Sequence, residues 1–302
     1  MQSVLIAGGS GLVGNQLTKR LLTTGYSVVW LTRKINHKIN IKQYEWDYKF
    51  KKADANAFKD ASIVINLSGA NVGAKRWDKT WKEDIYNSRV QATALLMDTI
   101  KMHGKKVHTV ISSSATGYYG TITSDNIFSE STGSGKDFLA TTCVDWENTL
   151  SNSKTENIRK IILRTGVVLS AEGGALSKMN ILFKMGLGAV LGSGKQYFSW
   201  IHIEDLCSLY VKAIEDNSIN GVYNAVAPSY ITNKDFTITL SNMFNKSIWL
   251  PNISAFLLKL ILGEIAGGLL YGSRVSPEKI VQAGYTFKFR NIQSALKDIY
   301  DK

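Results

Sequence analysis

The sequence contains little cysteine, histidine and proline. Its 302 residues include two Cys, four His and three Pro. Cys143 and Cys207 are too few for a disulfide framework, and the scattered histidines lack metal-ligand spacing, so we predict no metal site. Scarce thiols are typical of a reducing compartment, and we predict a cytoplasmic protein. Scarce proline excludes collagen-like and Pro-rich linker character.

The sequence also lacks a long uninterrupted apolar run. Its longest apolar stretch, residues 253–271, is broken by Lys259 and Glu264. A membrane span needs about 20 nearly uninterrupted apolar residues, so the stretch favours a buried or interface helix and we predict no membrane partner. No basic and apolar leader pattern follows Met1, so no signal peptide is predicted.

Acidic residues are too few to balance the basic ones. The chain has 24 Asp+Glu against 36 Lys+Arg, a formal charge of +12. This excess suggests an anionic partner: nucleic acid, a membrane surface or a phosphorylated small molecule. The lysines are dispersed along the chain. They cluster only at residues 34–52, which we interpret as a basic loop with few aromatic residues. A solvated surface is the simpler explanation, so nucleic-acid binding is not favoured.

Short apolar runs alternate with helical patterns along the first two-thirds of the chain. Strands are expected at residues 3–7, 27–31, 62–67, 107–112, 160–163 and 222–226, and helices at 12–23, 81–102, 138–150, 233–244, from 253, and 292–300. Runs that are apolar throughout indicate burial on both faces, hence a parallel sheet covered by helices. We predict a doubly wound α/β domain over residues 1–225 and a small, mainly helical C-terminal lobe over 226–302 on the substrate side.

A glycine-rich turn links the first expected strand to the first expected helix. Gly8, Gly11 and Gly14 fit the dinucleotide-binding pattern G-x-x-G-x-x-G. An early glycine makes the tight turn, Gly11 lets a pyrophosphate approach the backbone, and Gly14 lets the helix pack close to the strand. The free N–H groups at the helix start then bind phosphate. The alternative, a purely structural turn, is disfavoured by the strand–turn–helix context.

The end of the second strand indicates which dinucleotide is bound. An NAD site usually has an acidic residue about 20 residues further on, bonded to the ribose 2′-hydroxyl. Here the strand ends in Thr32 and Arg33, with no carboxylate. A guanidinium can stack on adenine and bind a 2′-phosphate. A solvated loop cation is the alternative, and we predict NADP(H) over NAD.

Several further motifs resemble one known family. They are Asn66–Ala70, Ser112–Gly120, Trp146-Glu147, Phe198–His202, Ser273–Val275 and Ala283–Tyr285. Together with the glycine turn they resemble atypical extended short-chain dehydrogenases/reductases, the subgroup called "epimerase family protein", which carries a C-terminal domain of unknown function. The resemblance implies a Rossmann fold that binds NADP(H). It also implies cofactor contacts at Gly8, Ser10, Gly11, Leu12, Val13, Gly14, Thr32, Arg33, Leu67, Ser68, Gly69, Asp84, Arg89 and Val167.

The usual catalytic pair of that superfamily is missing. Its chemistry relies on Tyr-x-x-x-Lys on one helix, and counting back from Glu147 puts Leu139 and Cys143 at these positions. Neither side chain is a phenol near neutral pKa or an ammonium. Ser114, Tyr118 and Tyr119 remain as catalytic candidates, with Lys178 or Arg76 as a neighbouring cation. The alternatives are backbone capping for Ser114 and packing in the pocket wall for both tyrosines.

Two functions stay open on the sequence alone. The first is an NADP(H)-dependent oxidoreductase or epimerase that acts on a small polar molecule, with a sugar-like substrate as one candidate. The second is a non-catalytic NADP(H)-binding sensor or interaction protein. A homodimer is left open. His202 is interpreted as structural, and the glycine-rich segment 186–194 as a flexible lid.

Overall fold

A parallel sheet forms the centre of the molecule. The computed structural model describes residues 2–155 and 157–301. The sheet has eight strands in the order β11-β8-β6-β5-β1-β2-β3-β4, parallel except for β4. Their bounds are β1 Ser3–Ala7, β2 Ser27–Thr32, β3 Lys42–Asp47, β4 Lys52–Ala53, β5 Ile63–Asn66, β6 Thr109–Ala115, β8 Arg159–Thr165 and β11 Gly221–Ala225. The predicted doubly wound α/β architecture is confirmed.

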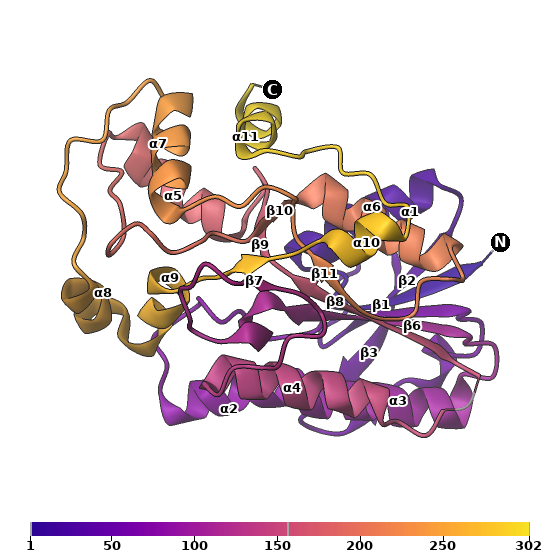
Figure 1. Cartoon of the computed structure of the whole chain (residues 1–302). Helices are drawn as coiled ribbons and strands as arrows, with labels where there is room; N and C mark the ends of the chain where they lie inside the picture. Colours follow the sequence, from indigo (N-terminus) through magenta and orange to yellow (C-terminus); the bar gives the residue numbers. More distant parts are fainter. Residues whose placement is uncertain (1, 156, 302) are drawn as a thin grey trace.

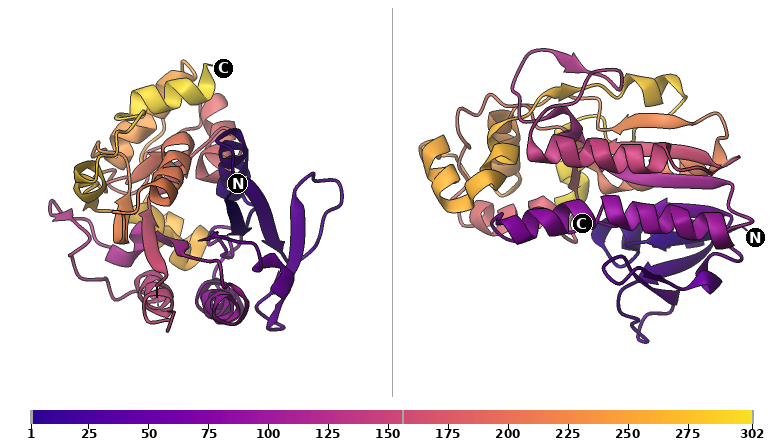
Figure 2. Two further views of the ribbon diagram at one scale, coloured as in Figure 1. Left: turned by 90° about the vertical axis from the view of Figure 1, so that its right-hand side faces the viewer. Right: turned by 90° about the horizontal axis from the view of Figure 1, so that it is seen from below.

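Helices cover both faces of the sheet (Figures 1 and 2). On one face, Val4 and Ile6 of β1 share a core with α1 (Leu12–Thr23) and α6 (Ile203–Glu215). On the other face, Leu5 and Ala7 share a core with α3 (Val90–His103) and α4 (Phe138–Ser151). Successive side chains of a strand point to opposite faces, so two covered faces require the continuous apolar runs in the sequence.

Two expected elements differ from the structure. The helix expected at 81–102 is two helices, α2 (Lys79–Asn87) and α3, because the chain breaks at Ser88 and Arg89. The Ser88 hydroxyl accepts a hydrogen bond from the Ala70 amide (2.8 Å), so the break is fixed by the loop after β5. The basic run was also wrongly interpreted as a loop: its residues 42–47 form β3, which pairs with β2.

A second, mostly helical layer lies beyond one end of the sheet (Figure 1). In it α5 (Gly174–Lys184), α7 (Asn233–Met243) and α11 (Ile292–Tyr300) enclose a core that includes Leu176, Phe236 and Leu296. The shorter elements are β7 Ile127–Phe128, β9 Val167–Leu169, β10 Trp200–His202, β12 Arg274–Val275, α8 Ala255–Leu262, α9 Gly267–Leu270, α10 Glu278–Gln282, and the 3-10 helices η1 Ala55–Ala57, η2 Thr116–Tyr119 and η3 Gly263–Ala266. Strand β9 pairs with β10, and β7 pairs with β12.

Buried polar residues of the β10–α6 junction anchor the C-terminal segment. The Asp205 carboxylate accepts hydrogen bonds from the Tyr285 hydroxyl (3.0 Å) and the amides of Lys288 (2.8 Å) and Phe289 (3.0 Å). His202 Nδ1 accepts the Glu204 amide at the start of α6, and burial lowers the pKa of this histidine. These contacts are structural, as interpreted for His202.

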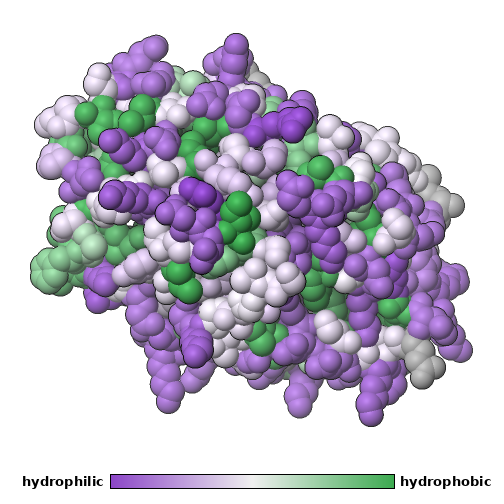
Figure 3. All heavy atoms as spheres, viewed as in Figure 1, coloured by the Kyte–Doolittle hydropathy of each residue, from purple (hydrophilic) through white to green (hydrophobic). Residues whose placement is uncertain are grey.

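The apolar stretch near residue 253 forms three short helices. Its first helix, α8, ends at Gly263, whose φ of +64° favours glycine. Phe256, Leu260 and Ile261 of α8 are 78%, 60% and 61% exposed, and apolar side chains gather at that edge of the molecule (Figure 3). Within residues 2–155 and 157–301, no helix is both long and apolar enough to cross a membrane.

Candidate functional site

The candidate site lies along the carboxyl edge of the sheet. The chain moves from β1 to β2 and β3 on one side, and through β5, β6 and β8 on the other. The loops after β1 and β5 therefore diverge, which leaves the crevice in which open α/β sheets bind their ligands. Residues 8–14 follow β1, Leu67–Gly69 follow β5, and η2 follows β6. Val167 opens β9 directly after β8.

The three pattern glycines serve different purposes. Gly8 has φ +86°, and a Cβ there would lie 2.8 Å from the Leu67 carbonyl oxygen. A Cβ at Gly14 would lie 2.4 Å from the Gly8 carbonyl oxygen. Packing thus requires both glycines. Gly11 is exposed, its φ is −73°, and a Cβ there would come no closer than 3.3 Å to Gly8 O. Its bare backbone leaves room outside the protein, where a ligand can approach.

The start of α1 offers free donors beside Gly11. Gly11 is the N-cap and makes no side-chain cap, and the first turn holds no acidic residue. The first intrahelical bond runs from the Asn15 amide to Gly11 O (2.9 Å), so the amides of Leu12 and Val13 precede the helical ladder. Free N–H groups and the positive end of the helix dipole suit a phosphate. This end of the crevice therefore fits the pyrophosphate of a dinucleotide.

A basic corner lies at the end of β2. Arg33 is exposed and follows Thr32, whose hydroxyl donates to Lys34 O (3.0 Å). Burial raises the pKa of Tyr48, and the charges of Lys49 and Arg33 oppose that rise, so both cations lie within electrostatic reach of one phenol. Asp84 is bound to Lys49 at 2.7 Å. Arg33 fits the 2′-phosphate expected of NADP(H), while the predicted cofactor contact of Asp84 stays a prediction.

Arg89 braces the loop after β5. Its guanidinium donates to Ile85 O (2.9 Å) and Ala70 O (3.1 Å), and lies 5.4 Å over the Trp146 ring. A Cβ on Gly69 would be 3.1 Å from the Arg89 Cζ atom. Burial lowers the pKa of Arg89. The Arg89 side chain therefore fixes the conformation of the loop at Gly69 and Ala70. Its predicted contact with the cofactor stays a prediction.

Ser114 belongs to a buried ionic network. Its hydroxyl donates to Glu147 Oε1 (2.6 Å), and Glu147 receives Nε and Nη2 of Arg164 at 2.9 and 2.8 Å. Ser114, Glu147 and Arg164 are only 4%, 7% and 3% exposed. Burial opposes the charge of Arg164, but the bonds to Glu147 prevail and raise the pKa of Arg164. Paired and hydrogen-bonded, these charges tolerate burial.

Arg164 is also the cation that approaches the two candidate tyrosines. Its guanidinium stacks 3.3 Å from the Tyr118 ring centroid and donates to the Tyr119 hydroxyl (3.1 Å). That hydroxyl also lies 2.7 Å from Asn224 Oδ1. Burial raises the pKa of Tyr119, and Arg164 opposes the rise. The cations suggested from the sequence lie elsewhere, because Lys178 donates to Gly73 O (2.9 Å) and Arg76 to Leu260 O (3.3 Å).

Leu139 and Cys143, the positions that counting from Glu147 assigned to the catalytic pair, carry no ionised group. Leu139 and Cys143 lie on α4 under Gly117, where a Cβ would be 3.6 Å from Leu139 Cβ and 4.0 Å from Cys143 Sγ. Burial raises the pKa of Cys143 to about 11. At neutral pH this thiol is protonated, and it supplies neither the charge nor the base that a lysine and tyrosine would provide.

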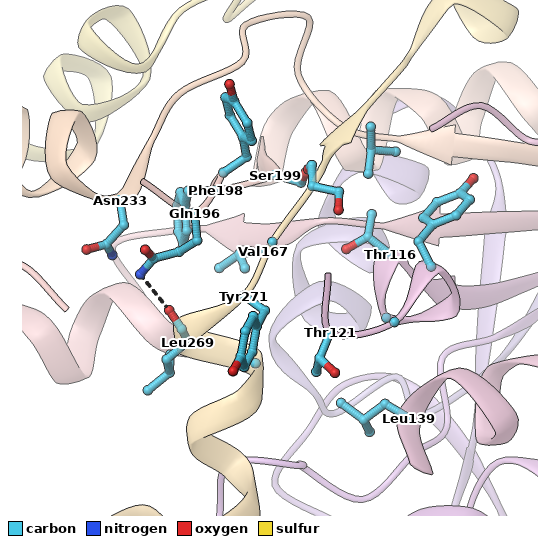
Figure 4. Close-up of a pocket in the computed structure, with 18 of the residues that line it drawn as sticks. Thr116, Thr121, Leu139, Val167, Gln196, Phe198, Ser199, Asn233, Leu269 and Tyr271 are labelled. Carbon is cyan, nitrogen blue, oxygen red and sulfur yellow. Dashed lines mark hydrogen bonds between the residues drawn. The ribbon is translucent and has the colours of Figure 1, made fainter. Parts of the chain in front are cut away.

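A cavity of about 190 Å³ opens beside these groups. Figure 4 shows Gln196 and Tyr271 on one side of it, with Thr116 and Leu139 on the other. It also includes Val167, a predicted cofactor contact. Neither Gln196 nor Tyr271 was predicted, because no local sequence pattern marks either residue. Each lines the cavity only because segments that are distant in the sequence pack together there.

One residue of the glycine-rich segment 186–194, Leu191, lines this cavity. The Gly192 amide donates to Ile253 O (2.9 Å), the Ile253 amide to Val190 O (2.9 Å), and the Lys234 amide to Gly194 O (3.0 Å). These bonds tie the segment to its neighbours on both sides. The structure therefore shows a segment hydrogen-bonded to its neighbours where the sequence indicated a flexible lid.

The cavity and the glycine turn are parts of one edge. A Cβ on Gly174, at the start of α5, would lie 3.3 Å from a Leu12 methyl group. The start of α5 thus packs on the residue that follows the glycine turn, and Ala175 of the same helix lines the cavity. The strand order, glycine turn and adjacent cavity define a Rossmann-type dinucleotide-binding protein with a second, mainly helical layer over the site.

Comparison with known sequences agrees with this class. The NAD dependent epimerase/dehydratase family matches residues 4–225, and a domain of unknown function, DUF1731, matches residues 253–299. The chain belongs to the NAD dependent epimerase/dehydratase family. Epimerase family protein Mb2239 of Mycobacterium bovis is 36% identical over 296 residues, which cover 97% of this chain and 96% of that protein.

Two solved structures are similar over almost the whole chain. Human epimerase family protein SDR39U1 with NADPH superposes with a TM-score of 0.91 at 29% identity and covers 100% of both chains. The nucleoside-diphosphate sugar epimerase of Corynebacterium glutamicum has a TM-score of 0.81 at 32% identity, over 99% of this chain and 58% of that one. These likenesses confirm the family resemblance deduced from the motifs.

Proposed function

We propose that this protein binds NADP(H) and acts as an oxidoreductase or epimerase on a small molecule held in the cavity beside Val167. The observation that carries the proposal is the continuity of the carboxyl edge. The exposed Arg33, the bare backbone of Gly11 and the cavity follow one another along it, in the order of the 2′-phosphate, the pyrophosphate and the nicotinamide of a dinucleotide. The similar human protein was solved with NADPH, which supports the same cofactor here.

Each part of the edge has a role in this proposal. The amides of Leu12 and Val13 hold the pyrophosphate, with Ser10 and Gly14 shaping the turn around it. Arg33 binds the 2′-phosphate, next to Thr32. Gly8, Leu67, Ser68 and Gly69 form the floor of the crevice, braced by Arg89. When bound there, the nicotinamide supplies hydride chemistry, and Val167 positions its end of the cofactor at the cavity.

Proton transfer is the less complete part of the machinery. Ser114 and Tyr119 direct their hydroxyls into bonds with Glu147 and Asn224, while Tyr118 packs under Arg164. We propose these three residues as the catalytic groups. Arg164 then supplies the nearby positive charge in place of the missing lysine. Thr116 and Tyr271 line the cavity itself and are further hydroxyl groups beside a bound substrate.

A second candidate function rests on the absence of an evident proton-transfer group among Leu139, Cys143 and Ser114. Leu139 and the protonated Cys143 cannot act as a base at neutral pH, and the Ser114 hydroxyl is hydrogen-bonded to Glu147. These features favour a protein that binds NADP(H) without turning over a substrate. Such a sensor binds the cofactor as tightly as the enzyme does. Sustained NADPH oxidation with aldehydes or ketones, or epimerisation of a nucleoside-diphosphate sugar without net change in the cofactor, supports the enzyme. Cofactor binding with neither reaction supports the sensor.

Calorimetric titration tests the cofactor assignment. NADPH is expected to bind at least about tenfold more tightly than NADH, because a charge-assisted contact to the 2′-phosphate contributes about 1.5–3 kcal/mol. Arg33→Ala should remove that preference. Lys105→Ala, which deletes an exposed cation before β6 at the opposite edge, is the matched control and should keep it. Equal affinity for the two dinucleotides in the unaltered protein would refute the assignment.

A further inference from the structure

Helix α8 is apolar on both of its faces. On the inner face, Leu258 packs in a small core with Ala266 and Leu270. The outer face carries exposed side chains at positions i, i+1, i+4 and i+5, which form one stripe: Phe256, Leu257, Leu260 and Ile261. A helix that is apolar all round is normally buried. The outer stripe therefore indicates a partner outside the described part of the chain.

The apolar surface continues from α8 to the end of α5. The loop that leads into α8 is held against that end, because Trp249 Nε1 donates to Gly186 O (2.9 Å). Trp249 is exposed, as are Met185 and Leu187 on either side of Gly186. We call the α8 stripe together with Trp249, Met185 and Leu187 the apolar edge. Helix α8 lies at the outer margin of the molecule in Figure 1, where apolar side chains gather in Figure 3. Exposed apolar groups gathered in this way mark a binding surface.

The two segments that build the apolar edge carry positive charge only. Residues 173–203 and 236–263, which contain α5 and α8, include five Lys and no Asp or Glu. Lys184 is exposed and directly precedes Met185. Lys246 is also exposed, and its Cδ would lie 3.7 Å from a Cβ on Gly186. Both lysines thus border the apolar side chains, and they account for part of the charge excess of the chain.

The far end of α8 shows the same sign of charge. The exposed Arg76 donates to Leu260 O (3.3 Å), which places a guanidinium at the last turn of the helix. Glu264 is the first carboxylate after α8, and Lys82 neutralises it at 2.5 Å. The apolar edge is therefore bordered by cations at both ends, and its electrostatic complement is an anionic surface.

A second copy of this chain is a poor cover for the apolar edge. An isologous interface places the same patch of both copies face to face. Lys184 and Lys246 would then meet the same cations of the second copy, and neither segment holds a carboxylate to pair with them. Like charges brought together in an interface oppose association. A surface with an apolar interior and anionic groups above it satisfies both parts of the edge.

We infer that the apolar edge binds the surface of a lipid bilayer that contains anionic lipids. Phe256 and Leu260 enter the boundary between headgroups and acyl chains, Trp249 lies at headgroup level, and Lys184 and Lys246 contact anionic headgroups. The prediction of no membrane partner rested on the lack of a spanning segment, and a helix that lies in the interface is a different case. The inference is independent of the proposed function.

Vesicle flotation tests the lipid and the charge. The full chain is mixed with vesicles of phosphatidylcholine alone or with about 30% phosphatidylglycerol, and the bound fraction gives a partition coefficient. Partitioning onto the anionic vesicles is expected to be at least about tenfold stronger than onto the neutral ones. Raising the salt from about 0.05 M to about 0.5 M should weaken it, because the lysines are exposed and their charges are screened.

Two double variants assign the binding to the apolar edge. Phe256→Gln with Leu260→Gln removes exposed apolar surface from α8 and should weaken partitioning at least about tenfold with the melting temperature unchanged. Leu22→Gln with Met102→Gln is the matched control. Both of its residues are exposed and lie near the ends of α1 and α3, away from the carboxyl edge of the sheet, so it should bind as the unaltered chain does.

A second double variant tests the cations without touching α8. Lys184→Gln with Lys246→Gln should weaken binding to the anionic vesicles about tenfold or more. Lys101→Gln with Lys105→Gln removes two exposed lysines at the end of α3 and beyond it, and should leave binding unchanged. Equal losses in the two lysine variants would show that net charge alone attracts the chain, and would overturn the placement at the apolar edge.

The remaining outcomes also decide the inference. Salt-sensitive binding to anionic vesicles that the α8 variant and the Lys184/Lys246 variant both weaken supports it. No binding, or equal binding to neutral and anionic vesicles, overturns it. Sedimentation of the chain without vesicles tests the other occupant: a dimer that Phe256→Gln with Leu260→Gln dissociates would assign the apolar edge to a second copy and overturn the inference as well.

Discussion

On the β1 side of the carboxyl edge polar groups are left for a ligand, whereas on the β6–β8 side they bind one another. The glycine-loop half, residues 8–14 with Thr32 and Arg33, has an uncapped helix start and an exposed cation. The serine half, Ser114, Tyr118, Tyr119, Glu147 and Arg164, is joined by hydrogen bonds and ring stacking.

The difference shows which half has kept the features of a binding surface. Donors without protein partners are inexpensive at a solvent-facing helix start, since water or phosphate satisfies them. Charges within the core are tolerated only when paired, and that pairing leaves Ser114 and Tyr119 little freedom to exchange protons. Cofactor binding and core stability are therefore expected to depend on different halves.

Breaking the ion pair of the serine half should have the largest effect. Arg164→Met leaves Glu147 buried without its partner, and the free energy of unfolding is expected to fall by about 3–5 kcal/mol in urea titrations. NADPH affinity of the folded fraction should change little. The double variant Arg164→Met with Glu147→Gln removes both charges and should recover part of the loss. A loss under about 1 kcal/mol in the single variant would contradict the network's role.

Substitutions at two glycines separate binding from packing. Gly11→Ala has an allowed φ and adds a Cβ toward the ligand space, so NADPH affinity should fall at least about tenfold with the melting temperature unchanged. Gly14→Ala adds a Cβ 2.4 Å from Gly8 O and should lower the free energy of unfolding by about 1–3 kcal/mol. Calorimetry and thermal melts measure both. Similar losses of stability in the two variants would remove the distinction.

Ser114→Ala should have a smaller effect, on stability. Glu147 loses one of its donors, and we expect a loss of about 1 kcal/mol in the free energy of unfolding, with NADPH affinity unchanged. Urea titration and calorimetry give the two quantities. Unaltered stability together with at least tenfold weaker NADPH binding would contradict this expectation. It would show that Ser114 serves cofactor binding, as the glycine-loop half does.

The pH dependence of stability tests the burial of the serine half from the side of α4. Burial raises the pKa of Cys143 from 9.0 to about 11, so folding favours the protonated thiol. That contribution is complete below pH 9 and is lost as the pH rises through the interval up to 11. Cys143→Ala should therefore flatten the fall in stability between pH 9 and pH 10.5 in urea titrations. An unchanged slope would show that the thiol is not buried from solvent as the structure has it.

The fold and the glycine-loop half were largely predictable from the sequence. Local apolar runs located the central strands, and the turn at Gly8–Gly14 is defined by residues adjacent in the chain. Strand β3 was missed because only one of its six side chains, Trp46, is buried, so it shows no continuous apolar run. The break between α2 and α3 depends on Ser88 and its bond to Ala70, which no local pattern encodes.

The serine half was only partly predictable, for the same reason. Ser114 and Arg164 are partners in the register of β6 and β8, although 50 residues separate them in the chain. Glu147 reaches both from α4. Counting from Glu147 indicated Leu139 and Cys143 in place of the catalytic pair, but register and helix packing determine which cation reaches the tyrosines.

Hydrogen–deuterium exchange with and without NADPH compares the two halves in one measurement. We predict that NADPH slows exchange at the amides of residues 10–14 and 33–34, where the structure leaves donors and a cation open. Amides around Ser114, Glu147 and Arg164 should exchange slowly in both states and change little. Protection concentrated in the serine half, with residues 10–14 unaffected, would contradict the account.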